Sequence, residues 1–249
     1  MLLDNKIAIV TGGGQGIGKG IAKAMAQSGA KVIIAELNKN LANVVDEIPN
    51  SKFIVCDVGD EVSVQSLINN VLSEFERIDI LVNNAGIIVR KDAIDHTLND
   101  WNNVLRVNLT GPFLMSKYTL KDAMIKQHSG CIINIGSTAG MNGYNRISYS
   151  STKAAIVNLS KSLALEVGQY GIRVNCICPG LIRTDLNSNL MDQPEMLVKL
   201  LPKVPMGRIG TPEDVAKVAV FLASNEADYV NGVALLVDGG QLCGFRVFD

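Results

Sequence analysis

Seven short apolar runs, rich in Val and Ile, recur along the 249-residue chain. Their apolar positions are nearly continuous rather than alternating, which is typical of strands covered on both faces of a parallel sheet. The predicted strands are Lys6–Thr11, Lys31–Ala35, Lys52–Cys56, Ile78–Asn83, Cys131–Gly136, Arg173–Ile177 and Ala234–Val237.

Longer segments with helical spacing of apolar positions separate these runs. They predict helices near residues 16–28, 39–48, 61–76, 98–126, 150–168 and 212–223. Thr211-Pro212-Glu213-Asp214 is a typical helix start, with an N-cap residue, a proline and two first-turn acids. Strand–helix alternation indicates right-handed βαβ units, so we expect an α/β fold: a doubly wound, seven-stranded parallel sheet with helices on both faces.

The segment near residues 184–210 departs from this alternation. It is amphipathic, carries three methionines and lies between Pro179-Gly180 and Pro205-Met206-Gly207. We interpret it as a mobile lid of short helices beside a binding site; a surface excursion without a role is the alternative. No repeat, low-complexity tract or Pro/Gly linker divides the chain, so residues 1–249 are expected to form a single domain.

Composition indicates a soluble protein with a sizeable core. Hydrophobic residues make up 47% of the chain, and Lys and Arg number 23 against 24 Asp and Glu. Without a basic block, nothing favours binding to nucleic acid or to an anionic membrane. No apolar stretch reaches the ~18 residues of a spanning helix, and the first residues lack the features of a signal peptide, so a cytoplasmic protein is expected.

The five cysteines are scattered and odd in number, which favours reduced thiols over disulfides. Cys176 and Cys178 are better interpreted as two residues on one side of a strand than as metal ligands. Because His96 and His128 are the only histidines, no metal site is expected.

A glycine-rich turn, Thr11-Gly-Gly-Gly-Gln-Gly-Ile-Gly18, joins the first predicted strand to the first helix. Glycines allow backbone N–H groups to approach a ligand closely, and a helix N-terminus favours phosphate. The G-x-G-x-x-G spacing is absent, and a P-loop nearly fits from Gly13 but has Gly20 where Mg²⁺ needs a hydroxyl. A third pattern for a phosphate-binding glycine turn, Gly12-x-x-x-Gly16-x-Gly18, is complete in this chain. A plain tight turn that binds no ligand is the structural alternative.

Glu36 ends the second predicted strand, 18 residues after Gly18. A carboxylate at this place can accept hydrogen bonds from an adenosine ribose and would repel the 2′-phosphate of NADP. No Arg or Lys stands at Gln15 or Leu37 to attract that phosphate. NAD(H) is therefore the favoured cofactor and NADP the less favoured one; a solvated loop acid is the alternative interpretation of Glu36.

Tyr149 and Lys153 are one helical turn apart, with Ser137 twelve positions upstream. Positions i and i+4 share a helix face, and a nearby cation favours the phenolate, so Tyr149 is a candidate proton donor and acceptor near neutral pH. Alone, such a pair is a weak signal, because Tyr and Lys often meet on a solvated helix face.

Together these residues resemble the short-chain dehydrogenases/reductases, in the branch of about 250 residues with one Rossmann-like domain. The resemblance covers essentially the whole chain and departs at no catalytic position. It is carried, in order, by Thr11–Gly18, Asp57-Val58, Asn83-Asn84-Ala85-Gly86, Asn108 within Val-Asn-Leu-Thr-Gly, Ser137, Tyr149 with Lys153, and Pro179-Gly180 with Thr184.

The resemblance implies an oxidoreductase that transfers a hydride between NAD(H) and a secondary alcohol or ketone. Tyr149 would exchange the proton, Ser137 would stabilise the carbonyl oxygen, Lys153 would assist Tyr149 and hold the nicotinamide ribose, and Asn108 would hold a proton-relaying water. The implied cofactor-binding residues are Gly12, Gln15, Gly16, Ile17, Gly18, Glu36, Asp57, Val58, Asn84, Ala85, Gly86, Tyr149, Lys153, Pro179, Gly180, Ile182 and Thr184.

The substrate stays open among sugars or polyols, hydroxysteroids, diketones and 3-oxoacyl groups. Residues 88–91, 141–145 and the 184–210 lid are expected to line its pocket, and nearby arginines and lysines make an anionic substrate one option. Glu36 argues against 3-oxoacyl reduction, which in this family usually draws on NADPH. A non-catalytic dinucleotide sensor and a P-loop phosphotransferase are the other classes considered. The family resemblance and an apolar C-terminus imply a homotetramer.

Overall fold

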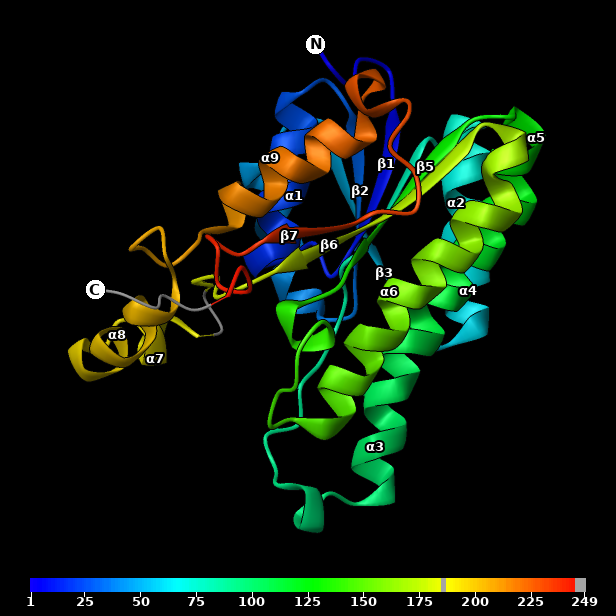
Figure 1. The fold of residues 1–249 in the computed structure, drawn as a ribbon. Coiled ribbons are helices and arrows are strands. Elements are labelled where there is room, and N and C mark those ends of the chain that lie inside the picture. Colours follow the sequence, from blue (N-terminus) through cyan, green and yellow to red (C-terminus); the bar gives the residue numbers. More distant parts are fainter. Residues whose placement is uncertain (185–186, 245–249) are drawn as a thin grey trace.

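Seven parallel strands form one sheet in the order β3-β2-β1-β4-β5-β6-β7, in a computed structural model that describes residues 1–184 and 187–244 (Figure 1). The strands are β1 (Ile7–Thr11), β2 (Lys31–Glu36), β3 (Ser51–Val55), β4 (Ile80–Asn83), β5 (Gly130–Ile135), β6 (Ile172–Pro179) and β7 (Ala234–Val237). All seven predicted strands are confirmed, with ends that shift by one or two residues. The order reverses between β1 and β4, where doubly wound sheets bind their ligands.

Helices cover both faces of the sheet, as predicted (Figure 1). On one face lie α1 (Gly16–Gln27) and α9 (Pro212–Ala223), which pack against each other. On the other lie α2 (Glu61–Phe75), α4 (Gly111–Thr119) and α6 (Ile147–Val167). The other helical segments are η1 (Lys39–Glu47), η2 (Ala93–Asp95), α3 (Leu98–Leu105), η3 (Arg106–Thr110), η4 (Leu120–Met124), α5 (Ile125–Gln127), η5 (Thr138–Gly140), η6 (Gly168–Tyr170), α7 (Ser188–Met191), α8 (Pro194–Leu200), η7 (Leu201–Lys203) and η8 (Asn225–Ala227).

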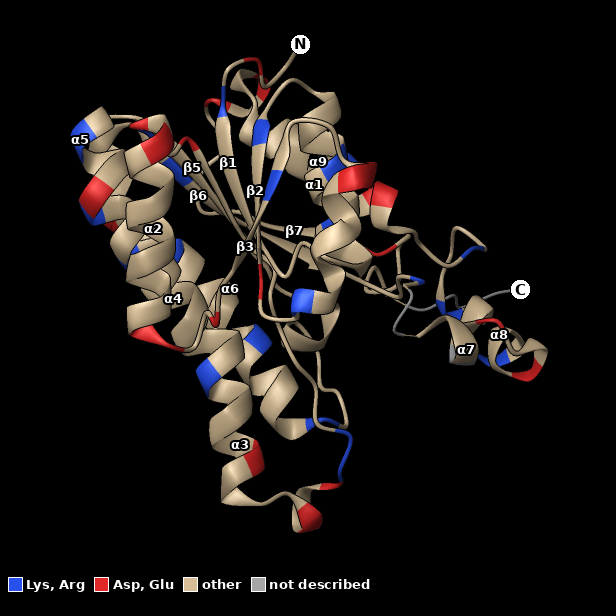
Figure 2. Cartoon of the chain, turned by 180° about the vertical axis from the view of Figure 1, so that it is seen from behind, with Lys and Arg blue, Asp and Glu red and all other residues tan. Residues whose placement is uncertain are grey.

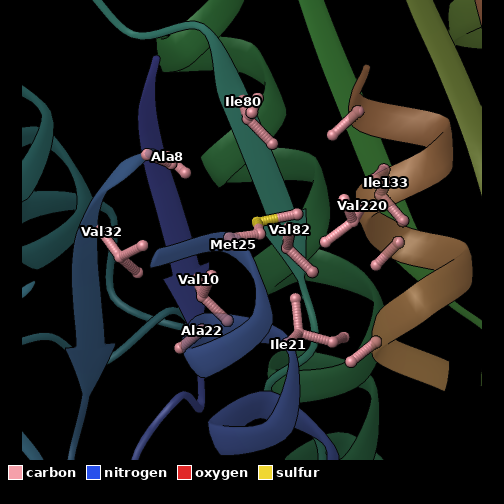
Figure 3. Close-up of a cluster of buried hydrophobic side chains, with 14 of the residues drawn as sticks. Ala8, Val10, Ile21, Ala22, Met25, Val32, Ile80, Val82, Ile133 and Val220 are labelled. Atoms are coloured by element: carbon pink, nitrogen blue, oxygen red, sulfur yellow. The ribbon is translucent and has the colours of Figure 1, made fainter. Parts of the chain in front are cut away.

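The strands are apolar on both sides because each side has its own core. Figure 3 shows the core on the α1/α9 side, where Ile21 and Met25 of α1 and Val220 of α9 meet Val10 and Val82 of the sheet. A second buried cluster on the opposite side joins the strands to α2, α4 and α6. Every residue of β1 is buried, which accounts for its unbroken apolar run.

The helix predicted over residues 98–126 is continuous from Leu98 to Gln127 but contains two π turns, η3 and η4. A π turn accommodates one extra residue in a helix and is often found at functional sites. The turn η3 changes the partner of the helix: α3 packs against α6, whereas α4 packs against α2.

Two helix predictions need adjustment. Residues 39–47 form a 3-10 rather than an α-helix; only Val44 is buried there, so little apolar packing is available to stabilise α-helical turns. The helix predicted from residue 150 begins at Ile147, which places Tyr149 in its first turn.

The segment near 184–210 contains the short helices α7, α8 and η7, drawn to the side of the sheet in Figure 1. Residues 185–186 of the predicted lid lie outside the described residues, as do residues 245–249 of the apolar C-terminus. The lid function and the packing of the C-terminus against a neighbouring subunit stay predictions.

Figure 2 shows Lys and Arg as well as Asp and Glu distributed along the helices, strand ends and loops of the described residues. Within residues 1–184 and 187–244, no helix combines the length and the apolar character needed to cross a membrane. Predicted site residues follow the carboxyl ends of the strands β1 to β6.

Candidate active site

The glycine turn lies between β1 and α1 and is fastened to the segment that follows β4. Thr11 Oγ1 accepts hydrogen bonds from the backbone N–H of Asn84 (3.0 Å) and of Ala85 (3.1 Å). The Asn84 side-chain amide donates to the carbonyls of Thr11 and Gly12, each at 3.0 Å. The predicted pyrophosphate turn and the Asn84-Ala85-Gly86 segment therefore form one rigid unit.

The geometry of this turn requires glycine. Gly12 and Gly16 have positive φ angles of 62° and 54°. A Cβ on Gly18 would lie 2.9 Å from the Gly12 carbonyl carbon and 2.5 Å from the Asn84 side-chain nitrogen. Gln15 at the N-cap of α1 makes no side-chain capping bond. A close backbone cradle at a helix N-terminus without a side-chain cap fits the pyrophosphate of a dinucleotide.

Glu36 reaches the same turn from the end of β2. A Cβ on Gly14 would lie 3.2 Å from the Cγ of Glu36, so the side chain is adjacent to the cradle. Its carboxylate accepts the backbone N–H of Asn38 at 3.1 Å. The predicted contact of Glu36 with an adenosine ribose stays a prediction.

Asp57 and Val58 follow β3 and lie against the long helix. The Asp57 carboxylate pairs with Arg106 at 2.9 Å and accepts the Gly59 N–H at 2.9 Å. Val58 is buried against Gly111, where a Cβ would lie 2.8 Å from Val58 Cγ2. The loop that contains Asp57 and Val58, predicted to bind adenine, therefore packs against the long helix at the π turn η3 and the residue after it.

Asn108 lies in η3 and is 1% exposed. Its side chain forms a two-way bond with Ile87, accepting the backbone N–H at 2.8 Å and donating to the carbonyl at 2.9 Å. It also donates to Thr152 Oγ1 at 3.3 Å, next to Lys153 in the sequence. A Cβ on Gly86 would lie 3.4 Å from Asn108 Oδ1 and 3.7 Å from Lys153 Nζ, so both polar groups converge on Gly86.

Ser137 follows β5 and caps η5, accepting the N–H of Ala139 at 3.1 Å. This short turn packs tightly against α6: a Cβ on Gly140 would lie 2.6 Å from both the Ala154 nitrogen and the Lys153 carbonyl oxygen. The contact sets the position of Ser137 relative to the residues on α6.

Lys153 is 5% exposed, and its ammonium donates to the Ile135 carbonyl at 2.6 Å. The same nitrogen lies 5.7 Å from the centre of the Tyr149 ring. Tyr149 itself is half-buried. Tyr149 and Lys153 therefore share a helix face, as predicted, and Lys153 reaches the end of β5, two residues before Ser137.

The thiols of Cys176 and Cys178 lie against Gly136, which precedes Ser137 in the chain. Their sulfur atoms are 3.8 Å apart, and a Cβ on Gly136 would lie 2.8 and 2.9 Å from them. Both residues are buried on one side of β6, as predicted. A hydrogen bond with Cys178 together with burial raises the pKa of the Cys176 thiol.

Residues after β6 close the site on its other side. Gly180 donates its N–H to the Val237 carbonyl at 3.0 Å, and Ile182 is buried. A Cβ on Gly16 would lie 3.5 Å from Thr184 Cβ, which connects the Pro179–Thr184 segment with the glycine turn. All the predicted site residues thus lie at the carboxyl ends of the strands or on the turns and helices beside them, and their roles stay predictions.

Sequence patterns did not identify three supporting groups: Thr11 as the link between loops, Thr152 beneath Asn108, and Arg106 beside Asp57. Thr11 and Thr152 adjoin recognised motifs, but their contacts join segments 73 and 44 residues apart. Arg106 precedes Asn108 by two positions, and its partner could not be inferred without the fold.

A cavity of about 510 Å³ lies at the other end of the sheet, with Lys6, Asp79, Arg173 and Tyr229 among its lining residues. These residues are near the amino ends of the strands, whereas the glycine turn, Ser137 and Tyr149 are at the carboxyl ends. This cavity is therefore separate from the candidate active site.

The strand order and the glycine turn after β1 are those of a doubly wound fold of the dinucleotide-binding type. A family model described as enoyl-(acyl carrier protein) reductase matches residues 12–241. The chain belongs to the short-chain dehydrogenase/reductase family, and its Rossmann-like fold and oxidoreductase class follow.

Relatives with different activities are similar over nearly their whole length. The chain is 40% identical to 3-oxoacyl-[acyl-carrier-protein] reductase of Salmonella typhimurium, over 97% of this chain and 99% of the relative. It is 34% identical to meso-2,3-butanediol dehydrogenase of Serratia marcescens, over 96% of each. The crystal structure of a putative gluconate dehydrogenase from Agrobacterium tumefaciens superposes with a TM-score of 0.93 at 34% identity, covering 98% of both chains.

Proposed function

We propose that the protein transfers a hydride between NAD(H) and a secondary alcohol or ketone, with Tyr149 as the acid and base. The observation that carries this proposal is that Tyr149 and Lys153 share a face of α6 and that Lys153 reaches the end of β5, two residues before Ser137. Lys153 donates to the Ile135 carbonyl there, and its ammonium lies 5.7 Å from the Tyr149 ring centre.

The proposed roles follow from the chemistry of these groups. Tyr149 gives a proton to the carbonyl oxygen during reduction or removes the hydroxyl proton during oxidation. The Ser137 hydroxyl donates a hydrogen bond to the same oxygen and stabilises its developing negative charge. The Lys153 ammonium, held beside the Tyr149 ring by the Ile135 carbonyl, holds the nicotinamide ribose. The nicotinamide, when bound, supplies the hydride chemistry.

Proton exchange with solvent is assigned to the π turn. Asn108 is fixed by Ile87 and by Thr152, whose hydroxyl donates to the Tyr149 carbonyl at 2.8 Å. Two hydrogen bonds thus connect Asn108 with the backbone of the proton-exchanging residue. We assign to Asn108 the water that carries protons outward, as in the family.

NAD(H) is proposed over NADP(H) because Glu36 places a carboxylate beside the glycine turn. The adjoining Leu37 side chain is 58% exposed and carries no charge that could attract a phosphate. The negative charge of Glu36 would repel a 2′-phosphate at this point, and the uncharged Leu37 could not offset that repulsion.

Reduction of a 3-oxoacyl thioester with NADPH is the second candidate. It is favoured by 40% identity to the Salmonella reductase over nearly the whole of both chains. Two segments that are predicted to line the substrate pocket would decide between a long acyl chain and a compact polyol. They are residues 141–145, which are all exposed, and the segment near 184–210.

Absorbance at 340 nm tests both candidates with one panel. The panel contains NAD⁺ with meso-2,3-butanediol, gluconate and steroid alcohols, NADH with the matching ketones, and acetoacetyl thioesters with NADH and NADPH. Turnover of an alcohol–ketone pair with NAD(H) supports the proposal. Turnover confined to the thioester with NADPH selects the second candidate, and NADH binding without any turnover would leave a dinucleotide sensor.

A further inference from the structure

Arg106 and Asp57 form an ion pair that joins the π turn η3 to the loop after β3. One terminal nitrogen of Arg106 lies 2.9 Å from each carboxylate oxygen of Asp57. The side chains are 41% and 29% exposed. Exposed pairs contribute little to the free energy of unfolding, at most about 1 kcal/mol, so stability alone does not explain this arrangement.

Two glycines allow the loop after β3 to lie directly on the π turn η3. A Cβ on Gly59 would come within 2.8 Å of Arg106 Cγ and 2.9 Å of its Cζ. A Cβ on Gly111 would lie 2.8 Å from Val58 Cγ2. Arg106 therefore lies against the Gly59 backbone while its end group holds Asp57, and the loop has little freedom to move.

The hydrogen bonds around Asp57 leave one defined place for a donor. Oδ1 accepts from both the Gly59 N–H and Arg106, whereas Oδ2 accepts from Arg106 alone. A carboxylate oxygen has two acceptor positions, so Oδ2 retains one. This acceptor suits the 6-amino group of adenine, but it repels the 6-oxo group of hypoxanthine, which offers no proton there.

Arg106 and Asn108 project from the same π turn in different directions. Arg106 contacts the loop after β3, whereas Asn108 bonds to Ile87 after β4 and to Thr152 on α6. The two contacts are independent, because neither side chain shares a bonding partner with the other. A change at Arg106 can therefore affect recognition of the base while the bonds of Asn108 remain.

We infer that Arg106 is a positioning residue for base recognition: it fixes the Asp57 carboxylate so that the site prefers a 6-amino purine to a 6-oxo purine. The inference rests on the proposed NAD(H) function of this site. Without Arg106, the Gly59 N–H alone holds the Asp57 carboxylate, and the Oδ2 acceptor loses its fixed direction.

Binding of NADH and of reduced nicotinamide hypoxanthine dinucleotide, followed by the fluorescence of the dihydronicotinamide, tests this inference. The unaltered protein is expected to prefer NADH by about tenfold, the value of one hydrogen bond to a charged group. Arg106→Gln is expected to remove most of this preference. Arg106→Met, which keeps the aliphatic stem against Gly59, provides the same test if the glutamine variant does not fold.

Two further variants separate positioning from a general effect on folding. Arg106→Lys keeps the charge and should retain the preference to within about threefold. Lys52→Gln breaks the exposed pair between Lys52 and Glu74 at the opposite end of β3 and should leave the preference unchanged. The inference would be overturned if Arg106→Gln and Arg106→Met both preferred NADH as strongly as the unaltered protein does. It would also be overturned if the unaltered protein bound the two dinucleotides equally well.

The readout is binding, so it does not depend on turnover. An intact preference for NADH in a protein that oxidises or reduces no compound of the panel would overturn the proposed function alone. A protein that turns over alcohols but shows no effect at Arg106 would overturn this inference alone.

Discussion

Gly140 lies directly against the backbone of Lys153, with room for a hydrogen but not for a Cβ, which would come within 2.6 Å of the Lys153 carbonyl oxygen. This contact joins the turn that carries Ser137 to the helix that carries Tyr149. Its tightness means that the spacing between the hydroxyl groups depends on a residue with no side chain.

Gly140→Ala is therefore expected to lower the free energy of unfolding by about 1–3 kcal/mol, because the turn must move away from α6. Turnover should fall as well, since Ser137 moves with the turn. Gly143→Ala is the matched control, because a Cβ there meets no atom within 4 Å. Urea unfolding of both variants checks the prediction, and equal midpoints would contradict it.

Tyr149→Phe removes the proposed proton donor while keeping the ring beside Lys153. We expect turnover to fall by roughly 10²–10⁴-fold, the range of general acid–base catalysis, with NADH affinity changed less than about twofold. Tyr229→Phe serves as control, because Tyr229 is 99% exposed and lies near the amino ends of the strands. Unchanged turnover in the Tyr149 variant would remove the basis of the proposed mechanism.

Glu36→Gln removes the negative charge beside the glycine turn with little change in shape. The ratio of kcat/KM for NADH to that for NADPH is expected to fall by about tenfold, because the like-charge repulsion of the 2′-phosphate is lost. Glu74→Gln, at an exposed pair with Lys52, should leave the ratio unchanged. A preference for NADPH in the unaltered protein would show that Glu36 does not select the cofactor.

Asp214→Asn tests a pH-dependent contact between α9 and the end of the 184–210 segment. The hydrogen bond from Arg208 is the largest effect on the Asp214 carboxyl and holds its pKa below the ordinary value of 3.8. Burial opposes this shift, whereas the hydrogen bonds from Thr211 and the charge of Arg208 add to it. A carboxyl group with a lowered folded-state pKa contributes stability above its ordinary pKa, and this contribution disappears as the pH falls through the folded-state value.

The variant should therefore unfold about 1–2 kcal/mol more easily at pH 7, with a difference that decreases progressively below pH 4. Glu213→Gln changes the neighbouring acid, which is exposed, and should show a smaller effect without this pH dependence. Thermal unfolding between pH 3 and pH 7 provides the measurement. A difference of constant size across that range would contradict the assignment.

The strands could be predicted because each lies between two helical layers, so its apolar run is uninterrupted. β7 was predicted to the residue, and the ends of the other six strands shifted by one or two residues. The 3-10 character of residues 39–47 could not be predicted in this way, since it depends on how little of the segment is buried.

The site residues were recognisable because each motif is local in the sequence. What could not be predicted were the contacts that fix them in space: Gly140 against Lys153, Thr11 with Asn84, and Arg106 with Asp57. These pairs are separated by 13, 73 and 49 residues, and each depends on backbones that approach closely only after the sheet has formed.

The π turn in the long helix has a consequence for sequence change in this region. Because the turn holds one residue more than an α-helical turn, deletion of a single residue from Arg106–Thr110 would rotate α3 relative to α4 by about 100°. The side of α3 that contacts α6 would then be turned away from it. Substitutions in α3 should thus be far better tolerated than any change in the length of the turn.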